Sequence, residues 1–232
     1  KLWKLRRGIV ELYVSEHPLD CLTCSANGDC ELQFVAAEVG LRDVRYNVEP
    51  SNTGQGVDAS SPFFFFDPAK CIVCSRCIRA CDDLQVTHAL SIDGRGFASR
   101  IISGADESFM ESDCVSCGAC VNECPVGALE EKQLRASGAP DKWVRTTCAF
   151  CGVGCQFDAG IKGNRLVTMK PAANSPVNNG HACVKGRFAS AYVNHKERLA
   201  TPLIREKNDG EFREASWKET YACHHRALET NP

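Results

Sequence analysis

The chain has 232 residues, which accommodate one to three small domains, and 44% of them are hydrophobic, as is ordinary for a folded protein. The net charge of −2 and the pI near 6.3 provide no basic field, so neither nucleic acid nor an anionic membrane is an expected partner. No apolar run approaches the roughly 20 residues that span a bilayer. We therefore expect no membrane span.

The 16 cysteines are compatible with disulfides, zinc or iron–sulfur clusters. Disulfide-rich folds are usually short and secreted, and they lack tightly clustered CxxC pairs. The chain opens on Lys1 without a start methionine or a signal peptide, so we expect a piece of a longer chain, or one whose beginning was not observed. So many thiols without a secretion signal favour metal ligation in a reducing compartment, which predicts a cytoplasmic location.

The first block is predicted to contain two helices and a linker. A second helical stretch covers 31–39, and Gly40 is suited to end it. The segment 49–61 is rich in Ser, Asn and Gly and is predicted to be a polar linker. The opening helix is predicted over 1–15 from apolar residues at helical spacing, which are Leu2, Leu5, Ile9 and Leu12.

Between these helices stands the pattern His17-x3-Cys21-x2-Cys24-x5-Cys30. Three cysteines without a fourth nearby need a different fourth ligand, and His17 precedes Cys21 by four residues. A cluster held by one imidazole and three thiolates carries one negative charge fewer than an all-thiolate cluster. Its reduction potential therefore lies higher, other things being equal. A zinc site with the same mixed ligands is the alternative.

The next block contains an internal repeat. Cys71-x2-Cys74-x2-Cys77-x3-Cys81 recurs as Cys114-x2-Cys117-x2-Cys120-x3-Cys124, and a hairpin is predicted around 93–96 between the copies. In this bacterial ferredoxin pattern the fourth cysteine of each copy serves the other cluster. The predicted sets are Cys71, Cys74, Cys77 and Cys124 for one [4Fe-4S] cluster, and Cys114, Cys117, Cys120 and Cys81 for the other.

The repeat departs from the strict pattern at one position. Pro125 follows Cys124 as the pattern requires, whereas Asp82 follows Cys81 in place of proline, which affects the turn more than the ligation. Two zinc sites are the alternative, but zinc favours separated CxxC pairs, and two complete copies favour iron–sulfur. A flexible stretch is predicted over 136–140.

A fourth predicted set consists of Cys148, Cys151, Cys155 and the remote Cys183. Three of them lie in one glycine-bearing loop, and zinc is an alternative for this set taken alone. The four sets together use 15 of the 16 cysteines and His17. Cys223 is left over and is interpreted as an ordinary buried or incidental thiol. The other histidines lack ligand spacing and are interpreted as structural; they are His88, His181, His195, His224 and His225.

The last block is predicted to be β-rich. Strands are expected over 156–161 and 165–169 around a turn at 163–164, and over 203–205 and 211–213 around a turn at 208–210. Ser216-Trp217-Lys218-Glu219 matches a capping box, so a helix is predicted to begin there.

Three stretches carry a resemblance to known families. His17-Pro18-Leu19-Asp20-Cys21 through Cys30-Glu31-Leu32-Gln33 resembles the histidine-ligated cluster of NADH dehydrogenase, multi-cluster [FeFe] hydrogenases and NAD-dependent formate dehydrogenases. The ferredoxin repeat is similar to the hydrogenases and the formate dehydrogenases. Thr146-Thr147-Cys148-Ala149-Phe150-Cys151-Gly152-Val153-Gly154-Cys155 and His181-Ala182-Cys183-Val184-Lys185-Gly186-Arg187-Phe188 look like the opening of a molybdopterin oxidoreductase domain of formate dehydrogenase type.

The resemblance reaches from the first helix to about Glu219, and the order of the blocks resembles the front of a formate dehydrogenase large (alpha) subunit. It implies an α+β, multi-domain iron–sulfur fold in three parts. A histidine-ligated cluster domain with its linker covers 1–60, and a ferredoxin-like 2[4Fe-4S] domain covers 61–138. The start of a molybdopterin oxidoreductase domain covers 139–232.

The resemblance also implies cofactors and partners. The family's catalytic domain binds bis-(molybdopterin guanine dinucleotide) with molybdenum or tungsten, oxidises formate to carbon dioxide, and sends electrons through four [4Fe-4S] clusters towards a flavin/NAD-binding diaphorase subunit. A [2Fe-2S] domain is expected before Lys1, and a small [2Fe-2S] subunit is an expected partner. Lys185 matches the family lysine between the proximal cluster and the pterin, with a solvated lysine as the alternative. The formate-oxidising residues are expected beyond Pro232.

Two further features receive modest interpretations. The aromatic run over 63–66 is expected to pack over the clusters or against a neighbouring domain. Four cations are candidates for offsetting cluster charge, with surface solvation as the default; they are Lys70, Arg76, Arg79 and Arg187. The rival functions are an iron–sulfur subunit of NADH dehydrogenase or [FeFe] hydrogenase, a stand-alone polyferredoxin, and a zinc-stapled interaction scaffold.

Overall fold

The computed structural model describes residues 1–46, 54–205 and 210–230. The chain forms two compact units, Lys1–Ser190 and Ala191–Pro232. Residues 49–53 of the predicted polar linker lie outside the described part, and so do Asn208 and Asp209 of the predicted turn. The structure therefore does not test these two predictions in full.

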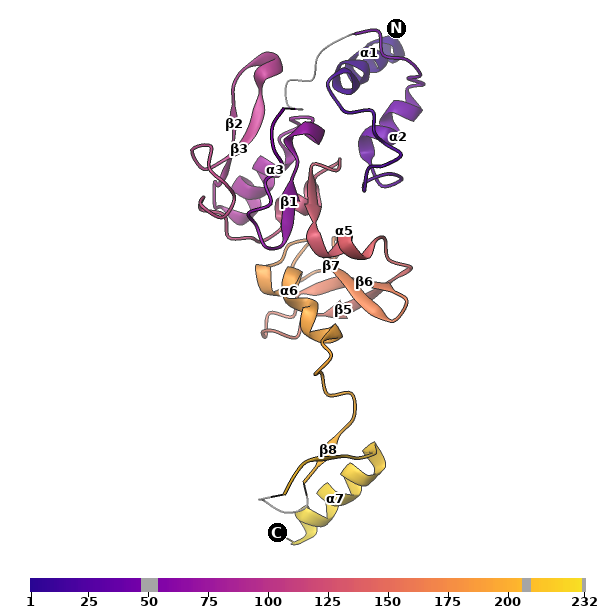
Figure 1. The fold of residues 1–232 in the computed structure, drawn as a ribbon, viewed down its shortest axis with the longest axis vertical. Coiled ribbons are helices and arrows are strands. Elements are labelled where there is room, and N and C mark those ends of the chain that lie inside the picture. The colour runs from indigo at the N-terminus through magenta and orange to yellow at the C-terminus, as the bar shows by residue number, and fades with distance from the viewer. Residues whose placement is uncertain (47–53, 206–209, 231–232) are drawn as a thin grey trace. The chain divides into compact units, whose positions relative to one another are not determined.

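Two helices open the first unit and pack on each other (Figure 1). Helix α1 (Leu2–Ser15) and helix α2 (Glu31–Glu38) lie where the sequence predicts them. Gly40 follows α2 with φ +66°, the left-handed conformation in which glycine commonly ends a helix. Both predicted helices and the predicted stop are confirmed.

Helix α1 does not bury its apolar stripe. Leu5 and Ile9 are 59% and 56% exposed, whereas Val10 and Glu11 are buried. The Glu11 carboxylate accepts hydrogen bonds from the Arg45 amide at 2.6 Å and from the Arg45 guanidinium at 2.7 Å. Because a buried carboxylate needs a paired charge, this contact ties α1 to the segment that follows α2.

The segment with the cysteine repeat is built on two antiparallel strand pairs. Strand β1 (Phe64–Phe66) pairs with β4 (Leu129–Glu131), which brings the two ends of the segment together. Strand β2 (Leu90–Asp93) pairs with β3 (Arg100–Ser103) and confirms the predicted hairpin. The helical pieces are all short; they are η1 (Pro68–Lys70), α3 (Arg76–Arg79), η2 (Ala80–Gln85), η3 (Gly96–Ala98) and α4 (Ala119–Glu123). The two copies of the repeat meet where α3 packs against α4.

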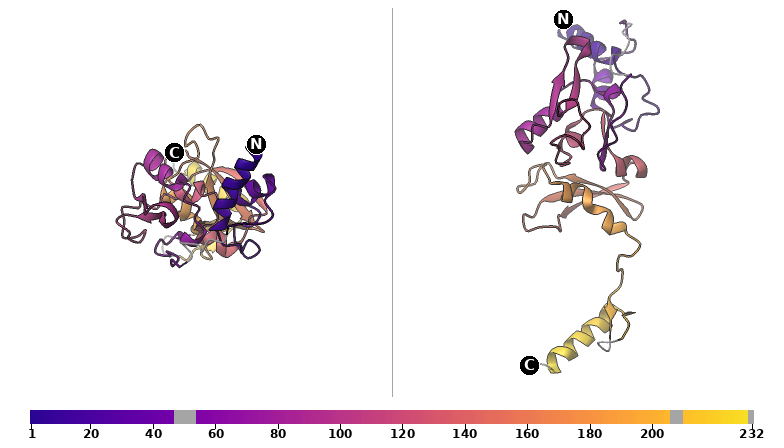
Figure 2. Two further views of the ribbon diagram at one scale, coloured as in Figure 1. Left: turned by 90° about the horizontal axis from the view of Figure 1, so that it is seen from above. Right: turned by 60° about the vertical axis from the view of Figure 1, so that its left-hand side comes forward.

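A three-stranded antiparallel sheet carries the next block, in the order β5-β6-β7. Strands β6 (Gln156–Lys162) and β7 (Arg165–Pro171) confirm the predicted pair and its turn. Strand β5 (Lys142–Thr147) was not predicted, because all its side chains are exposed and show no alternation. Helix α5 (Lys132–Ser137) occupies part of the stretch predicted to be flexible, and α6 (Val184–Phe188) packs against β7 (Figure 2).

The second unit consists of a short strand pair and a helix. Strands β8 (Leu203–Ile204) and β9 (Arg213–Glu214) are shorter than predicted, and the turn η4 (Ala189–Asn194) spans the division between the units. Helix α7 (Trp217–Thr230) begins at the predicted capping box. The Ser216 hydroxyl accepts from the Glu219 amide at 3.2 Å, which forms one half of the box, while the Glu219 carboxylate binds Arg213.

Aromatic side chains form much of the core of the first unit. The Phe64 ring meets Phe109 edge-on, with 5.0 Å between centroids, and Phe66 approaches the same ring at 5.9 Å. Phe63 stacks on Phe188 of α6 at 4.8 Å and an interplanar angle of 6°. The run over 63–66 thus packs against both the cysteine-bearing core and the block that follows it, as expected.

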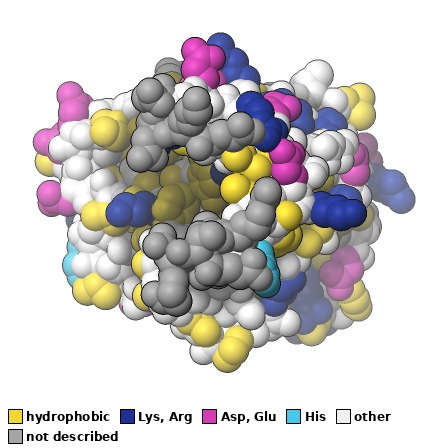
Figure 3. Space-filling model, turned by 90° about the horizontal axis from the view of Figure 1, so that it is seen from below, with side chains coloured by type: hydrophobic (Ala, Val, Ile, Leu, Met, Phe, Trp, Pro, Cys, Tyr) yellow, Lys and Arg dark blue, Asp and Glu magenta, His cyan; other side chains and the backbone are white. Residues whose placement is uncertain are grey.

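Within the part of the chain that the structure describes, no helix is both long enough and apolar enough to cross a membrane. Basic and acidic side chains are interspersed on the face drawn in Figure 3, in keeping with the small net charge. The mixture of helices and antiparallel strands confirms the mixed class. The division into cofactor domains at residues 60 and 138 stays a prediction.

Candidate metal centres

Two pockets of the first unit are each lined by four cysteines. The pocket beside Phe66 has about 320 Å³ of empty volume, and its cysteines are Cys71, Cys74, Cys77 and Cys124. The pocket beside Phe64 has about 340 Å³, and its cysteines are Cys81, Cys114, Cys117 and Cys120. Each pocket takes three thiols from one copy of the repeat and the fourth from the other copy, which is the exchange expected of a bacterial ferredoxin pattern.

The loops that present these thiols have the same backbone conformation in both copies. Left-handed φ angles occur at Val73 (49°) and Ser75 (63°), and at the matching Ser116 (53°) and Gly118 (77°). The amides of Val73 and Ser116 each donate to the sulfur of the cysteine two residues earlier, at 3.4 Å. A β-branched residue adopts a positive φ only where its surroundings impose it, and such strain clusters at functional sites.

Burial disfavours the charged form of these thiols. It raises the pKa of Cys71 to about 11 and of Cys77 to about 12, and it holds the pKa of Cys120 well above the usual range. The charge of Cys77 also acts on Cys120, so the two pockets adjoin. Metal ligands must be thiolates, so a cation bound here would displace protons and compensate the gathered negative charge. The donor set fits iron in that respect.

The first predicted set lies on the connection between α1 and α2. His17 follows the end of α1, Cys21 and Cys24 lie in the turns after it, and Cys30 is the N-cap residue of α2. The His17 Nδ1 atom lies 2.9 Å from the Pro18 carbonyl oxygen, while Nε2 is buried and has no hydrogen-bond partner in the part of the chain that the structure describes. A metal-ligating histidine commonly uses one ring nitrogen on a backbone carbonyl and the other on the metal, so the orphaned Nε2 fits a ligand role.

The loop of the first set docks on the second set, which consists of Cys71, Cys74, Cys77 and Cys124. The Lys70 Nζ atom, one residue before Cys71, lies 3.4 Å from the Cys24 sulfur. A Cβ atom added at Gly127, just after Cys124, would lie 3.2 Å from the same sulfur. Gly127 therefore permits a close approach of backbone and thiol, and the two sets are neighbours.

Of the four cations considered for offsetting cluster charge, two are largely buried. The Lys70 and Arg187 side chains are 15% and 3% exposed. Arg76 instead forms a two-pronged ion pair with Glu31 at 2.6 and 2.7 Å, and Arg79 is exposed. Surface solvation therefore describes Arg79, whereas Lys70 and Arg187 lie where a cluster charge would act on them.

The fourth predicted set lies beside the three-stranded sheet. Cys148 and Cys155 flank the loop between β5 and β6, where the Cys148 amide donates to the Cys155 carbonyl at 2.8 Å. Cys183 is the N-cap residue of α6. Burial raises the pKa of Cys155, and the charges of Cys148, Cys151 and Cys183 raise it further, so the four thiols are close together. Cys151 and Cys183 are exposed.

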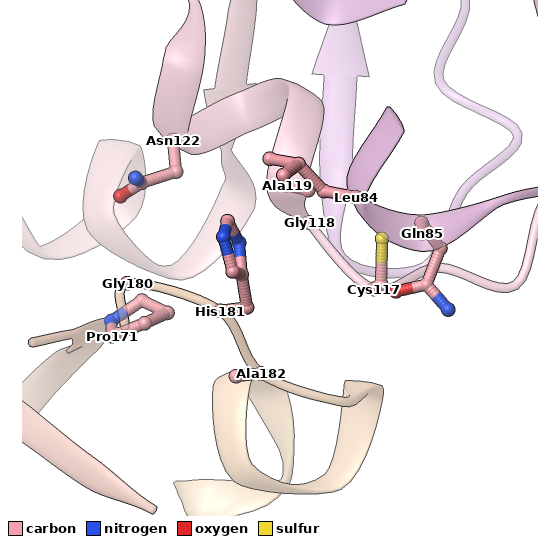
Figure 4. A pocket seen from close by; sticks show the side chains of 10 residues that line it. All are labelled: Leu84, Gln85, Cys117, Gly118, Ala119, Asn122, Pro171, Gly180, His181 and Ala182. Atoms are coloured by element: carbon pink, nitrogen blue, oxygen red, sulfur yellow. The ribbon is translucent and has the colours of Figure 1, made fainter. Parts of the chain in front are cut away.

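The third set consists of Cys81, Cys114, Cys117 and Cys120. A small pocket lies between this set and the fourth (Figure 4). Cys117 and Gly118 line one side of it, and His181 and Ala182 line the other. The His181 ring points from its loop towards α4, which carries Ala119. Because Ala182 directly precedes Cys183, the pocket marks a short path between the two sets. The structural interpretation of His181 is compatible with this packing.

The remaining predicted site residues lie as follows. Lys185 is exposed on α6, two residues after Cys183, and its role towards a pterin stays a prediction. Cys223 is exposed on α7 of the second unit, so the buried form of its interpretation is wrong. Within residues 1–46, 54–205 and 210–230, no three or more His, Cys, Asp or Glu side chains are placed to hold a single metal ion. The assignment of the four ligand sets stays a prediction.

Two contacts at the site were not predicted. A Cβ atom at Gly118 would lie 2.7 Å from the Phe188 ring, so the turn between Cys117 and Cys120 packs directly on α6. Glu131 of β4 forms a buried ion pair with Arg187 of α6 at 3.2 Å. A glycine inside a cysteine run signals close backbone approach and was available in the sequence. No sequence pattern links Glu131 to Arg187, because their proximity depends on tertiary packing.

Three family models match the chain. The NADH-ubiquinone oxidoreductase-G iron-sulfur binding region matches residues 6–45, and the 4Fe-4S dicluster domain matches residues 70–128. The molybdopterin oxidoreductase Fe4S4 domain matches residues 141–195. All residues of the four predicted ligand sets fall inside these three ranges.

The chain is also similar to curated proteins and to a solved structure. The "Probable oxidoreductase YjgC" of Bacillus subtilis is 34% identical over 88% of this chain and 24% of its own length. The "Putative formate dehydrogenase SH0748" of Staphylococcus haemolyticus is 32% identical over 89% and 25%. The chain thus spans about a quarter of these relatives. A chain of an NAD⁺-reducing [NiFe]-hydrogenase in the H₂-reduced state is 31% identical, with a TM-score of 0.46, over 56% of this chain and 55% of that chain.

Proposed function

We propose that this chain, an iron–sulfur electron-transfer portion of a formate dehydrogenase-like oxidoreductase subunit, holds four [4Fe-4S] clusters in a row. Each cluster, when bound, accepts and releases single electrons. The chain itself supplies 15 thiolates and one imidazole and holds them in four sets, and apolar side chains pack around the two sets of the repeat.

One observation carries this proposal: two neighbouring pockets are each lined by three thiols from one copy of the repeat and one from the other. Chance would not distribute eight cysteines in this way. The strained, repeated loop conformation and the amide-to-sulfur hydrogen bonds support the same conclusion, since hydrogen bonds to cluster sulfurs tune their potentials.

The contacts between the sets support a linear order. The set of His17 adjoins the set of Cys71 through Lys70 and Gly127. The second and third sets adjoin through Cys77 and Cys120. The pocket of Cys117 and His181 separates the third set from the fourth. An order without long gaps is what single-electron transfer needs.

The whole protein's activity is a further part of the proposal. We infer that it oxidises formate to carbon dioxide at a bis-(molybdopterin guanine dinucleotide) site with molybdenum or tungsten, next to Lys185 and the fourth set. A [2Fe-2S] domain, a small [2Fe-2S] subunit and a flavin/NAD-binding diaphorase subunit would receive the electrons, in the cytoplasm. The matches to a molybdopterin oxidoreductase domain and to putative formate dehydrogenases support this. We also propose domain boundaries near residues 60 and 138, which fall between the matched ranges 6–45, 70–128 and 141–195.

Iron counting on the anaerobically purified protein tests the cluster proposal. We expect a brown protein with about sixteen iron atoms and as many sulfides per chain, from four clusters of four. Cys71→Ala and Cys124→Ala should each lose about four iron atoms, and the double variant should still lose about four, because both residues hold one cluster. Cys114→Ala combined with Cys124→Ala should lose about eight.

The exposed Cys223 provides the matched control, since it belongs to none of the sets. Cys223→Ser should keep the full iron content. If the iron losses of Cys71→Ala and Cys124→Ala add up in the double variant, the two residues hold different clusters, and this would contradict the exchange of the fourth cysteine between the copies. A colourless protein that contains zinc would contradict the whole proposal and favour an interaction scaffold. Past residue 232, an [FeFe] domain in place of a molybdopterin domain would assign the relay to a hydrogenase.

A further inference from the structure

One ion pair of the first unit has both of its charged side chains buried. Arg187 Nη2 lies 3.2 Å from Glu131 Oε2, and both side chains are 3% exposed. The Thr168 hydroxyl donates to the same carboxylate at 2.8 Å, and Arg187 Nη1 donates to the Met169 carbonyl oxygen. The pair joins α6, β4 and β7. Buried ion pairs contribute little net stability, because desolvation offsets their attraction, so stability alone does not account for this one.

One nitrogen of the Arg187 guanidinium has no acceptor among the described residues. Glu131 and Met169 bind the two Nη atoms, whereas Arg187 Nε is buried and has no hydrogen-bond partner within residues 1–46, 54–205 and 210–230. A buried N–H group without an acceptor is unfavourable and rare in native structures. An acceptor is therefore expected beside Nε in the loaded protein.

The side chain of Arg187 lies against the third ligand set. Its Cγ atom is 3.2 Å from the position that a Cβ atom would take at Gly118, inside the turn between Cys117 and Cys120. Burial lowers the pKa of Arg187, while the charges of Glu131 and Cys120 raise it, so the guanidinium is within electrostatic range of that thiol. An arginine remains charged in such a setting.

We propose that Arg187 is a positioning residue that presents its Nε–H to the [4Fe-4S] site of Cys81, Cys114, Cys117 and Cys120 and raises its reduction potential. This rests on the proposed function. Reduction adds one negative charge at the site, and a fixed cation with a hydrogen-bond donor stabilises the reduced form more than the oxidised form. Glu131 holds the Nη end and leaves Nε available.

The position of Arg187 gives this tuning a direction. Helix α6 begins after Cys183, and the Arg187 amide donates to the Cys183 carbonyl at 3.1 Å, so one helical turn connects the residue to the fourth set. A higher potential at the third set favours the electron there over the neighbouring fourth set. Arg187 therefore biases electron transfer away from the fourth set.

A redox titration of the complete, anaerobically purified subunit, followed by low-temperature electron paramagnetic resonance, tests the proposal. Because Arg187→Met alone leaves a buried carboxylate unpaired, the main comparison is the double variant Arg187→Met/Glu131→Gln against Glu131→Gln. We expect the double variant to lower the potential of one cluster, with about a tenfold change in electron partition, or about 59 mV for one electron. The other three clusters should keep their potentials.

Two further variants separate the contributions. Glu131→Gln removes the negative charge and keeps Arg187, so it should raise the potential of the same cluster. Arg187→Lys keeps the charge without the Nε donor and should give a smaller decrease than the loss of the cation. The matched control is Arg135→Met, because Arg135 is 53% exposed in its pair with Glu130; it should change no potential.

The two proposals fail in distinguishable ways. About sixteen iron atoms in every variant, with no cluster shifted or with all four shifted equally, would overturn the role of Arg187. A wild-type iron content far below that would instead overturn the proposed function. If the double variant loads poorly, the upward shift expected of Glu131→Gln decides the matter, and its absence would also overturn the role of Arg187.

Discussion

Gly118 shows how much one residue contributes at this site. Its φ of 77° matches that of Ser75 in the first copy of the repeat, which is 63°, so the loop shape alone does not require glycine. What differs is the neighbour: a Cβ atom at Gly118 would lie 2.7 Å from the Phe188 ring. The glycine is therefore explained by the close contact between the third ligand set and α6, in addition to its backbone conformation.

Gly118→Ala is expected to lower the free energy of unfolding by about 1–3 kcal/mol, from left-handed strain and overpacking against Phe188. Denaturant unfolding under anaerobic, reducing conditions measures this. Gly8→Ala is the matched control. Gly8 lies within α1, and no described atom outside its own helix backbone and chain neighbours lies within 4 Å of the position that its Cβ atom would take. Gly8→Ala should raise stability by roughly 0.5–1 kcal/mol. Equal effects of the two changes would contradict the packing argument.

His17 carries the prediction for the first set. His17→Ala removes the one non-thiolate side chain among the predicted ligands, so about four of the expected sixteen iron atoms should be lost. His17→Cys should retain the iron, and the added negative charge should lower the potential of that cluster. Iron analysis and a redox titration measure both effects. Full iron retention in His17→Ala would show that the buried Nε2 is not a ligand.

At the scale of elements, an ion pair holds α1 against the segment that follows α2. The Arg45 guanidinium and amide donate to Glu11, and these hydrogen bonds lower the pKa of the carboxyl group to about 2. A carboxyl group whose folded pKa lies below its unfolded value stabilises the fold above the unfolded pKa, near 4.5. That contribution is lost as the pH falls from there towards the folded value.

Glu11→Gln should therefore destabilise the docking of α1 at neutral pH. The difference in docking stability between the variant and the wild type should disappear as the pH falls from about 4.5 to about 2. Hydrogen exchange of the α1 amides, compared between variant and wild type at each pH, measures the difference. Glu38→Gln at the exposed end of α2 is the control and should show no such pH dependence. A difference that does not change with pH would contradict the role of the ion pair.

The elements also show where sequence patterns suffice. Helices α1 and α2, the hairpin β2–β3 and the pair β6–β7 follow from periodicity, glycine and turn residues. Strand β5 was not predicted because both its faces are exposed. The buried side of α1 was unexpected as well, since its stripe of Leu and Ile faces outward while the polar Glu11 is buried by pairing with Arg45.

At the scale of the whole molecule, all sixteen predicted ligands lie in the unit Lys1–Ser190. The second unit contains β8, β9 and α7 and contributes none of them. Iron binding should therefore depend on the first unit alone. Short elements with little regular structure also depend on bound metal for much of their folding free energy.

A chain that ends at Asn194, which keeps η4 whole, is expected to bind as much iron and sulfide as the 232-residue chain. Iron analysis and visible absorbance measure this after anaerobic expression of both chains. Removal of the iron with a chelator should then unfold the shorter chain, because ligation supplies its folding free energy. Loss of iron on truncation would show that the second unit supports a cluster set.

The sequence by itself determined the candidate ligands, because a cluster requires cysteines at short, fixed spacings and the repeat makes these visible. It also determined the principal helices and hairpins, since periodicity and turn residues act locally. Only the tertiary structure decided which sets are neighbours, that Gly118 and Gly127 permit close contact, and that Arg187 meets Glu131 while its Nε atom has no acceptor among the described residues. These features join residues far apart in the chain, where packing and desolvation act and local sequence patterns carry no signal.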